Sequence, residues 1–122
     1  MKILFLDDDE RRLETARRVY AQEHDLHIVT TAKAAIDALQ KDTFDVAMLD
    51  HDLEGEFFVD SNRVDCGMEV VRWMVENRPV VGNVIVHSWN QRAGLEMTDA
   101  LKKAGFNVEY TPFTYIESDS SI

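Results

Sequence analysis

The sequence predicts an α/β fold: a single three-layer, doubly wound domain around a five-stranded parallel sheet. Short apolar segments that suit strands alternate with longer segments of helical periodicity, which is the pattern of consecutive βαβ units. The chain has 122 residues, of which 45% are hydrophobic and 30% charged, as expected of one domain with a core. Because no internal repeat or linker divides it, we expect one domain over residues 1–122.

The first three elements are read from their hydrophobic patterns. Residues 3–6 (Ile-Leu-Phe-Leu) form a continuous apolar run, which is typical of a strand buried on both faces. Residues 10–20 carry apolar side chains every three or four positions, and this spacing predicts an amphipathic helix. Residues 26–29 (Leu-His-Ile-Val) predict a second strand, whose histidine favours a place at the edge of the sheet.

The next segments predict a helix, a strand and a long loop. Thr31 is placed to cap a helix whose apolar side chains, from Ala32 to Leu39, recur at spacings of three, four and seven. Residues 46–49 (Val-Ala-Met-Leu) are apolar throughout, as expected of a third, buried strand. The polar stretch that follows predicts a long loop over residues 50–66.

The last third of the chain completes the alternation. Residues 67–77 predict a helix that ends before a proline, and residues 84–86 (Val-Ile-Val) predict a fourth strand. Residues 91–104 have apolar side chains along one face, and a glycine follows at the position of a helix C-cap. Residues 107–110 predict a short fifth strand with polar positions, and we expect no helix in the tail, residues 114–122.

This alternation implies right-handed crossovers and therefore a parallel sheet. The second and fifth strands carry the polar interruptions that suit edges, which predicts the flavodoxin-like strand order 2-1-3-4-5. In that order a ligand site lies at the carboxyl ends of the strands, near the switch between the first and third. The residues expected there are Asp7, Asp8, Asp9, Asp50, His51, Asp52, His87, Ser88, Trp89, Asn90, Thr111, Pro112 and Phe113.

Charge and cysteine content exclude several classes of protein. The 13 basic and 23 acidic residues leave a net charge of −10, which argues against a broad nucleic-acid-binding surface. No apolar run approaches the ~20 residues of a membrane span, and the first residues turn acidic at once, unlike a secretory signal. The single Cys66 excludes an intramolecular disulfide and a cysteine-based zinc site, and no basic neighbour in sequence favours a nucleophilic role. We expect a cytoplasmic location.

Asp7, Asp8 and Asp50 are candidate metal ligands. Carboxylates brought together at one end of a sheet repel each other, and a cation offsets that cost. Oxygen ligands favour Mg²⁺ or Mn²⁺, and a histidine in the ligand set would admit Zn²⁺. Asp9 is placed instead to cap the helix that begins at residue 10.

His51 and His87, together with Asp50, are candidate catalytic groups, because imidazoles exchange protons near neutral pH. Both histidines follow adjacent strands, and strands lie ~4.8 Å apart, so we expect the two rings to flank one phosphate. The alternative is a histidine that is simply hydrogen-bonded at a strand end. Candidate ligands of phosphate oxygens are Ser88, Asn90 and Thr111. For Asn90 the alternative is the N-cap of the following helix.

Several other side chains have more than one interpretation. Phe57 and Phe58 are candidates for a lid over the site, with a loop that packs its own aromatic rings as the alternative. Trp89 could stack on a base or pack within the protein. His24 and His27 belong to the far end of an edge strand, where we expect no role in the site.

Four segments, in order and at matching spacing, resemble a response-regulator receiver domain: residues 2–8, 44–50, 104–105 and 112–113. The resemblance implies the receiver fold, with Asp50 in the place of the phosphorylated aspartate. Receivers hold a lysine that pairs with the phosphoryl group where this chain has Thr111. Because charge neutralisation at a transferred phosphoryl group is a main catalytic factor, ordinary phosphorelay is not expected.

Two histidine motifs resemble a divergent lineage, the cyclic-phosphate processing receiver domains. They are His51-Asp52-Leu53 and His87-Ser88-Trp89-Asn90. The resemblance implies hydrolysis of phosphoesters, with a small cyclic phosphate or an RNA end as substrate. The last helix of receivers has no counterpart here, so a second copy of the chain could cover that face of the sheet as a homodimer.

The leading hypothesis is thus a metal-assisted phosphoesterase, and three others stay open. The first is a non-enzymatic, receiver-derived module that binds a metal or a protein. The second is a receiver that accepts phosphate on Asp50 despite Thr111. The third is a minimal haloacid-dehalogenase-like phosphatase, because Asp7-x-Asp9 resembles that family's first motif, although Arg11 stands where threonine or valine is expected.

Overall fold

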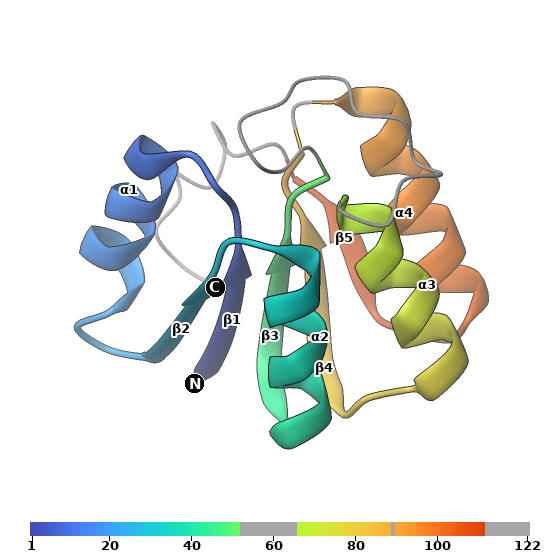
Figure 1. Cartoon of the computed structure of the whole chain (residues 1–122), viewed down its shortest axis with the longest axis horizontal. Coiled ribbons are helices and arrows are strands. Elements are labelled where there is room, and N and C mark those ends of the chain that lie inside the picture. Colours follow the sequence, from blue (N-terminus) through green and yellow to red (C-terminus); the bar gives the residue numbers. More distant parts are fainter. Residues whose placement is uncertain (52–65, 89, 112–122) are drawn as a thin grey trace.

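The computed structural model describes residues 1–51, 66–88 and 90–111. Within them it contains five strands and four helices, which alternate as the hydrophobic pattern predicts (Figure 1). In chain order they are β1 Lys2–Leu6, α1 Glu10–Tyr20, β2 Asp25–Val29, α2 Ala32–Lys41, β3 Phe44–Leu49, α3 Gly67–Asn77, β4 Val81–Val86, α4 Gln91–Lys103 and β5 Val108–Tyr110.

The five strands form one parallel sheet in the order β2-β1-β3-β4-β5, which confirms the predicted doubly wound topology. The edge strand β2 is less buried than its inner neighbour: every residue of β2 is at least partly exposed, whereas four of the five residues of β1 are buried. The two strands predicted as edges from their polar positions, β2 and β5, are the edges of this sheet.

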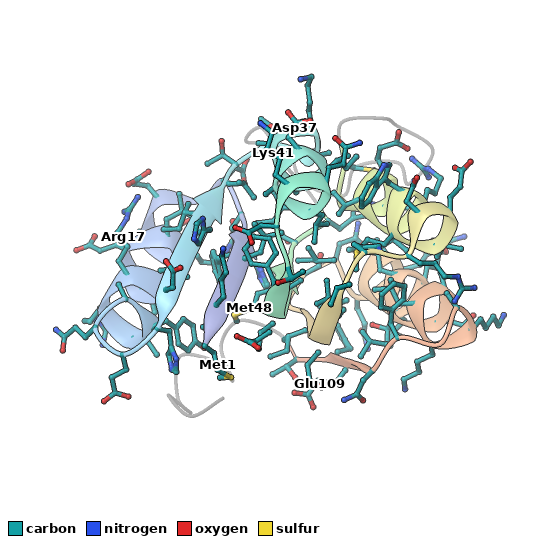
Figure 2. The ribbon with its side chains drawn as sticks, turned by 90° about the horizontal axis from the view of Figure 1, so that it is seen from below. Met1, Arg17, Asp37, Lys41, Met48 and Glu109 are labelled. Atoms are coloured by element: carbon teal, nitrogen blue, oxygen red, sulfur yellow. The ribbon has the colours of Figure 1, made fainter. Side chains whose placement is uncertain are left out.

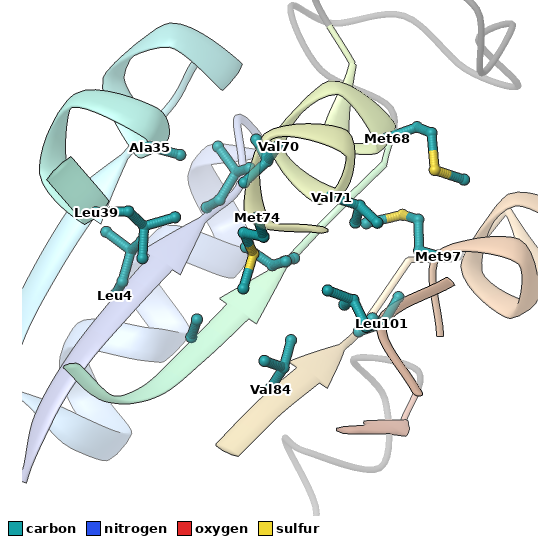
Figure 3. Packing of buried hydrophobic residues seen from close by; sticks show 14 of the residues in the cluster. Leu4, Ala35, Leu39, Met68, Val70, Val71, Met74, Val84, Met97 and Leu101 are labelled. Carbon is teal, nitrogen blue, oxygen red and sulfur yellow. The ribbon is translucent and has the colours of Figure 1, made fainter. Parts of the chain in front are cut away.

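The larger part of the core lies between the sheet and helices α2, α3 and α4 (Figure 3). Leu4 and Leu6 of β1 face this side, as do Leu49 of β3 and Val84 and Val86 of β4. Helix α1 covers the opposite face, where its buried stripe packs against Ile3, Phe5, Val46 and Met48. Successive strand residues alternate between the two clusters, so the side on which each strand-end residue lies follows from its position.

Polar side chains of the helices mark the periphery. Figure 2 shows Arg17 of α1 and Asp37 and Lys41 of α2 on the outside of the molecule, with Met48 of β3 near its centre.

No helix in the described ranges is long and apolar enough to cross a membrane. The cytoplasmic location and the homodimer both stay predictions.

Strand β4 begins at Val81, three residues before the predicted start. Gly82 and Asn83 are poor strand formers, so no local pattern signals this extension. It arises from pairing with β3, in the register Phe44↔Val81 and Val46↔Asn83. A Cβ atom at Gly82 would lie 2.7 Å from the carbonyl oxygen of Asp45, so a glycine allows the backbones to approach here.

Helix ends follow the predicted capping pattern. Asp9 accepts hydrogen bonds from the backbone N–H groups of Arg11 and Arg12, and Thr31 accepts one from Ala34. After α4, Gly105 adopts a φ of 97°, in the left-handed region that glycine tolerates best. The lid candidates Phe57 and Phe58, most of the loop over residues 50–66, Trp89 and the tail, residues 114–122, where no helix is expected, lie outside the described residues.

Candidate metal and phosphate site

Three residues stand in a row across the carboxyl edge of the sheet. Asp7, Asp50 and His87 each follow a strand directly, one step beyond the paired positions of β1, β3 and β4. Each still donates its backbone N–H to the neighbouring strand: Asp7 to Val29 at 3.2 Å, Asp50 to Leu6 at 3.1 Å and His87 to Leu49 at 3.0 Å. The sheet itself therefore fixes their spacing.

Asp7, Asp8 and Asp50 bring their carboxylates together. Each offers one oxygen, and these atoms all lie within 4.8 Å of one another. Asp7 is fully buried and Asp50 is 3% exposed, whereas Asp8 is partly exposed. Carboxylates this close, with little solvent around two of them, are stabilised by a cation. Three oxygen donors at this spacing fit Mg²⁺ or Mn²⁺, which leave further positions to water or substrate.

Arg12, which the sequence interpretation did not single out, is the basic partner of these carboxylates. Its Nε lies 2.7 Å from Asp7 Oδ2 and its Nη2 lies 3.0 Å from Asp7 Oδ1, a bidentate ion pair. Nη2 also lies 3.6 Å from Asp50 Oδ2. Burial lowers the pKa of Arg12, but the hydrogen bond and charge of Asp7, with Asp50 and Asp9, raise it overall above the ordinary value.

A signal for Arg12 was present in the sequence. It lies four residues before the buried Ala16 and next to the buried Leu13, at the head of the stripe that α1 turns toward the sheet. A long cationic side chain in the first turn of that stripe reaches the carboxyl edge, where β1 ends. The hydrophobic periodicity identified the stripe without extending it to this polar position.

His87 is buried beneath the acidic cluster. Its ring stacks on Phe5, with centroids 5.0 Å apart and planes 9° from parallel. Its Nδ1 lies 3.6 Å from Asp7 Oδ2. Burial lowers the pKa of His87 to about 4, since the opposing effect of the Asp7 charge is smaller and Arg12 lowers it further. At neutral pH the ring is therefore neutral, and it can accept a proton or bind a metal.

His51 lies on the other side of the sheet, so the structure does not place the two histidines around one phosphate. Its side chain hydrogen-bonds Cys66, which belongs to the core cluster of α2, α3 and α4. Burial raises the pKa of the Cys66 thiol, but the hydrogen bond and charge of His51 lower it overall. Strand alternation explains the separation: Met48 and Asp50 share one face, and His51 must take the opposite one.

Gly67 holds the first turn of α3 against the end of β3. Its N–H donates to the carbonyl of His51 at 2.8 Å. A Cβ atom at this position would lie 1.9 Å from the carbonyl oxygen of Asp50 and 2.8 Å from His51 Cα. Only glycine allows this approach, so the backbone that carries Asp50 is fixed from the helix side as well as from the sheet.

The predicted phosphate ligands have local partners. The backbone N–H of Asn90 donates to Ser88 Oγ at 3.1 Å, and Asn90 Oδ1 accepts from the N–H of Ala93 as the N-cap of α4. Tyr110, which was not predicted, donates its hydroxyl to the Ser88 carbonyl at 2.7 Å. Thr111 follows β5 and donates its N–H to Val86 at 2.8 Å. These bonds order the segment around Ser88, beside the acidic cluster.

His24 lies at the opposite end of the sheet from this cluster, as predicted, whereas His27 is the middle residue of β2, opposite Leu4 of β1. His24 Nδ1 is 3.1 Å from the amino group of Met1, which precedes β1. His27 pairs with Asp25 near the start of β2. The position of His24 makes it a suitable control residue for experiments on the site.

Comparison with known families matches residues 2–103 to the sequence profile of the cyclic-phosphate processing receiver domain. No curated protein sequence matches the chain significantly. The match covers the acidic cluster, Arg12 and the two candidate site histidines, His51 and His87.

Several solved structures with similar folds are receiver domains. That of a LuxO repressor protein from Vibrio parahaemolyticus has a TM-score of 0.65 and 17% identity, covering 91% of this chain and 76% of that one. A CheY-like receiver from Methanospirillum hungatei has a TM-score of 0.65 and 19% identity, covering 91% and 79%. The non-phosphorylated HemR receiver from Leptospira biflexa has a TM-score of 0.65 and 18% identity, covering 96% and 90%. At these identities the likeness shows the fold.

Proposed function

The chain belongs to the cyclic-phosphate processing receiver family, and from this premise we propose that it is a metal-assisted phosphoesterase. The observation that carries the proposal is the row formed by Asp7, Asp50 and His87, with Asp8 beside it. This row joins oxygen ligands for a cation to a neutral imidazole at one edge of the sheet.

Asp7, Asp8 and Asp50 would hold the divalent cation, Mg²⁺ or Mn²⁺ by their oxygen chemistry, with Zn²⁺ if His87 joins them. A bound cation would supply Lewis-acid chemistry and neutralise charge on a phosphoester. The local cation would also let a protein of net charge −10 accept an anionic substrate. Ser88 and Thr111, at the ends of the neighbouring strands, would donate to phosphate oxygens.

The reaction is opening of a 2′,3′-cyclic phosphate, either free or at an RNA end. A water molecule attacks phosphorus, one ester P–O bond breaks, and a phosphomonoester and a hydroxyl result. The neutral ring of His87 accepts the proton of the attacking water, and solvent returns a proton to the leaving oxygen. Ordinary phosphorelay is not part of this proposal, because Thr111 stands in the place of the receiver lysine.

His51, predicted from the sequence as a second catalytic group, does not enter this step. Its hydrogen bond to Cys66 gives it a structural place on the far side of β3. In this proposal its contribution is to hold the strand end from which Asp50 projects.

Hydrolysis of a 2′,3′-cyclic nucleotide tests the proposal, with Mg²⁺, Mn²⁺ and Zn²⁺ supplied in turn. We expect metal-dependent turnover that falls about 100-fold or more in His87→Gln and in Asp50→Asn. His24→Gln, at the opposite end of the sheet, is the matched control and should keep full activity. Absence of turnover by the wild-type protein with all three metals would overturn the proposal.

One observation favours a second candidate, a non-enzymatic module that binds a metal or a partner protein. His87 is fully buried and the buried carboxylate of Asp7 is already paired with Arg12, so neither of these two side chains is open to solvent. Metal binding without turnover, together with a stable complex containing a partner protein, would support this alternative.

A further inference from the structure

We propose that Arg12 is the cationic side chain that binds phosphate at this site. It would take the role that a lysine has in receivers, at the position where this chain has Thr111. The inference rests on the proposed function, since it assigns the anion ligand of the same site. It draws on an element that the predicted ligands do not use: the first turn of α1, which approaches the carboxyl edge from the helix side.

The guanidinium lies among the acidic groups, and the Arg12 side chain that carries it is partly exposed. The Arg12 side chain is 22% exposed, whereas Asp7 is fully buried and Asp50 nearly so. Among the described residues, it is the one lysine or arginine within 4.0 Å of either carboxylate. Because Arg12 is partly exposed while the Asp7 and Asp50 carboxylates are buried, an anion from solvent can reach Arg12 more readily than either carboxylate.

Arg12 has donors to spare. A guanidinium carries five N–H donors, and within the part of the chain that the structure describes the side-chain hydrogen bonds of Arg12 are the two to Asp7. Nη1 lies 3.7 Å from Asp9 Oδ2, and Nη2 lies 3.6 Å from Asp50 Oδ2, which are ion-pair contacts longer than hydrogen bonds. These donors match the geometry by which arginine binds phosphate oxygens in bidentate fashion.

Charge explains why the arginine and a cation are both needed. One guanidinium faces four carboxylates, those of Asp7, Asp8, Asp9 and Asp50. That surplus of negative charge repels a phosphate until a divalent cation joins the cluster. Asp7 gives both of its oxygens to Arg12, so a cation on Asp7 weakens that ion pair and frees donors for the incoming anion. Phosphate binding should therefore depend on the metal.

The backbone already orders this arginine. Asp9, the N-cap of α1, accepts from the N–H of Arg12 at 3.3 Å, and Asp7 Oδ1 accepts from the N–H of Asp9 at 2.9 Å. The carboxylate that Arg12 contacts thus also shapes the turn that presents Arg12. A side chain fixed in this way loses little conformational entropy when it binds an anion.

Calorimetric titration tests the inference without any turnover. The whole chain is titrated first with Mg²⁺ and then, at saturating Mg²⁺, with inorganic phosphate. We expect Arg12→Gln to bind Mg²⁺ at least as tightly as wild type, because a competing cation is gone. We expect its phosphate affinity to fall at least about tenfold. A role confined to stabilising the fold would not weaken phosphate binding while leaving Mg²⁺ binding undiminished. Arg11→Gln is the matched control, because it removes the same charge from an exposed residue of the same helix. It should alter neither affinity.

Arg12→Lys keeps the positive charge and removes the planar guanidinium with its paired N–H donors. If Arg12→Gln does not fold, this second variant tests whether Arg12 binds phosphate. We expect its phosphate affinity to fall about threefold or more. Phosphate affinity equal to wild type in the folded Arg12 variants would overturn the inference, as would a wild-type protein that binds no phosphate at saturating Mg²⁺. Phosphate binding that depends on Arg12 in a protein without turnover would instead remove the proposed phosphoesterase and leave the anion site.

Discussion

Asp50 and His51 are adjacent in the chain and serve opposite faces of the sheet. The Asp50 carboxylate lies 3.6 Å from Nη2 of Arg12, on the side covered by α1. The ring of His51 hydrogen-bonds Cys66, on the side covered by α2, α3 and α4. One strand end therefore carries both a site residue and a core residue, and changes to each should have separable effects.

Substitution of the two neighbours should separate metal binding from stability. We expect His51→Ala to lower the free energy of unfolding by about 2 kcal/mol, because it removes a buried ring and a hydrogen bond. Its Mg²⁺ affinity should stay within about twofold of wild type, whereas Asp50→Asn should weaken Mg²⁺ binding by more than about tenfold. Urea unfolding and calorimetry measure the two effects. A His51→Ala protein that loses Mg²⁺ affinity as Asp50→Asn does would contradict the separation.

Gly67 and Gly82 offer a matched pair of backbone tests at opposite ends of β3. An added methyl group would meet the Asp50 carbonyl in the first case and the Asp45 carbonyl in the second. We expect either alanine variant to lower stability, by about 3 kcal/mol at Gly67, where the overlap is deeper. Only Gly67→Ala should also weaken Mg²⁺ binding by the folded protein, because it displaces the backbone of Asp50. Equal Mg²⁺ affinities in the two variants would refute a positioning role for Gly67.

Most of the fold was predictable because it is written in local patterns. Apolar runs located the strands, three- and four-residue spacings located the helices, and polar positions such as His27 and Glu109 identified the edges. The early start of β4 was not predictable, since Gly82 and Asn83 form strand only through pairing with β3. Tertiary contact overrode local propensity there.

The acidic part of the candidate site was predictable from the sequence, whereas the prediction of its other residues was incomplete. Asp7, Asp8 and Asp50 converge because parallel strands end at one edge, and topology alone requires this. The separation of His51 from His87 follows from side-chain alternation, which was not applied beyond the strand ends. Arg12 was missed because a cation in a helix is ordinarily a solvated surface residue, and its place at the head of the buried stripe of α1 was not taken into account.

The buried His87 should make the metal-free protein less stable in acid. Its pKa is about 4 in the folded protein against an ordinary 6.5. The unfolded chain therefore binds the proton first, so the stability contribution is full above pH ~6.5 and is lost as pH falls through about 4. The total loss attributable to this group is about 3 kcal/mol.

The measurement compares unfolding of wild type and His87→Gln in EDTA across pH 4 to 7. Because the chain carries many other ionisable groups, the informative quantity is the difference in unfolding free energy between the two proteins. That difference should shift against the wild-type protein as pH falls from about 6.5. Parallel profiles would show that His87 is not held neutral.

Removal of the divalent cation should lower stability in a way that depends on Asp8. A ligand that binds only the folded state stabilises it by about 2.7 kcal/mol at one hundred times its dissociation constant. We expect Mg²⁺ to raise the thermal midpoint of the wild-type protein and EDTA to reverse the effect. Asp8→Asn should lose most of this stabilisation, since Asp8 is the partly exposed member of the cluster and its replacement leaves Asp7 and Asp50 with Arg12 intact. Asp37→Asn on α2, a partly exposed acidic residue paired with Lys33, should retain it. Equal stabilisation of the two variants by Mg²⁺ would mean that the ion acts through the general acidity of the protein, and the assignment of Asp8 as a ligand would then fail.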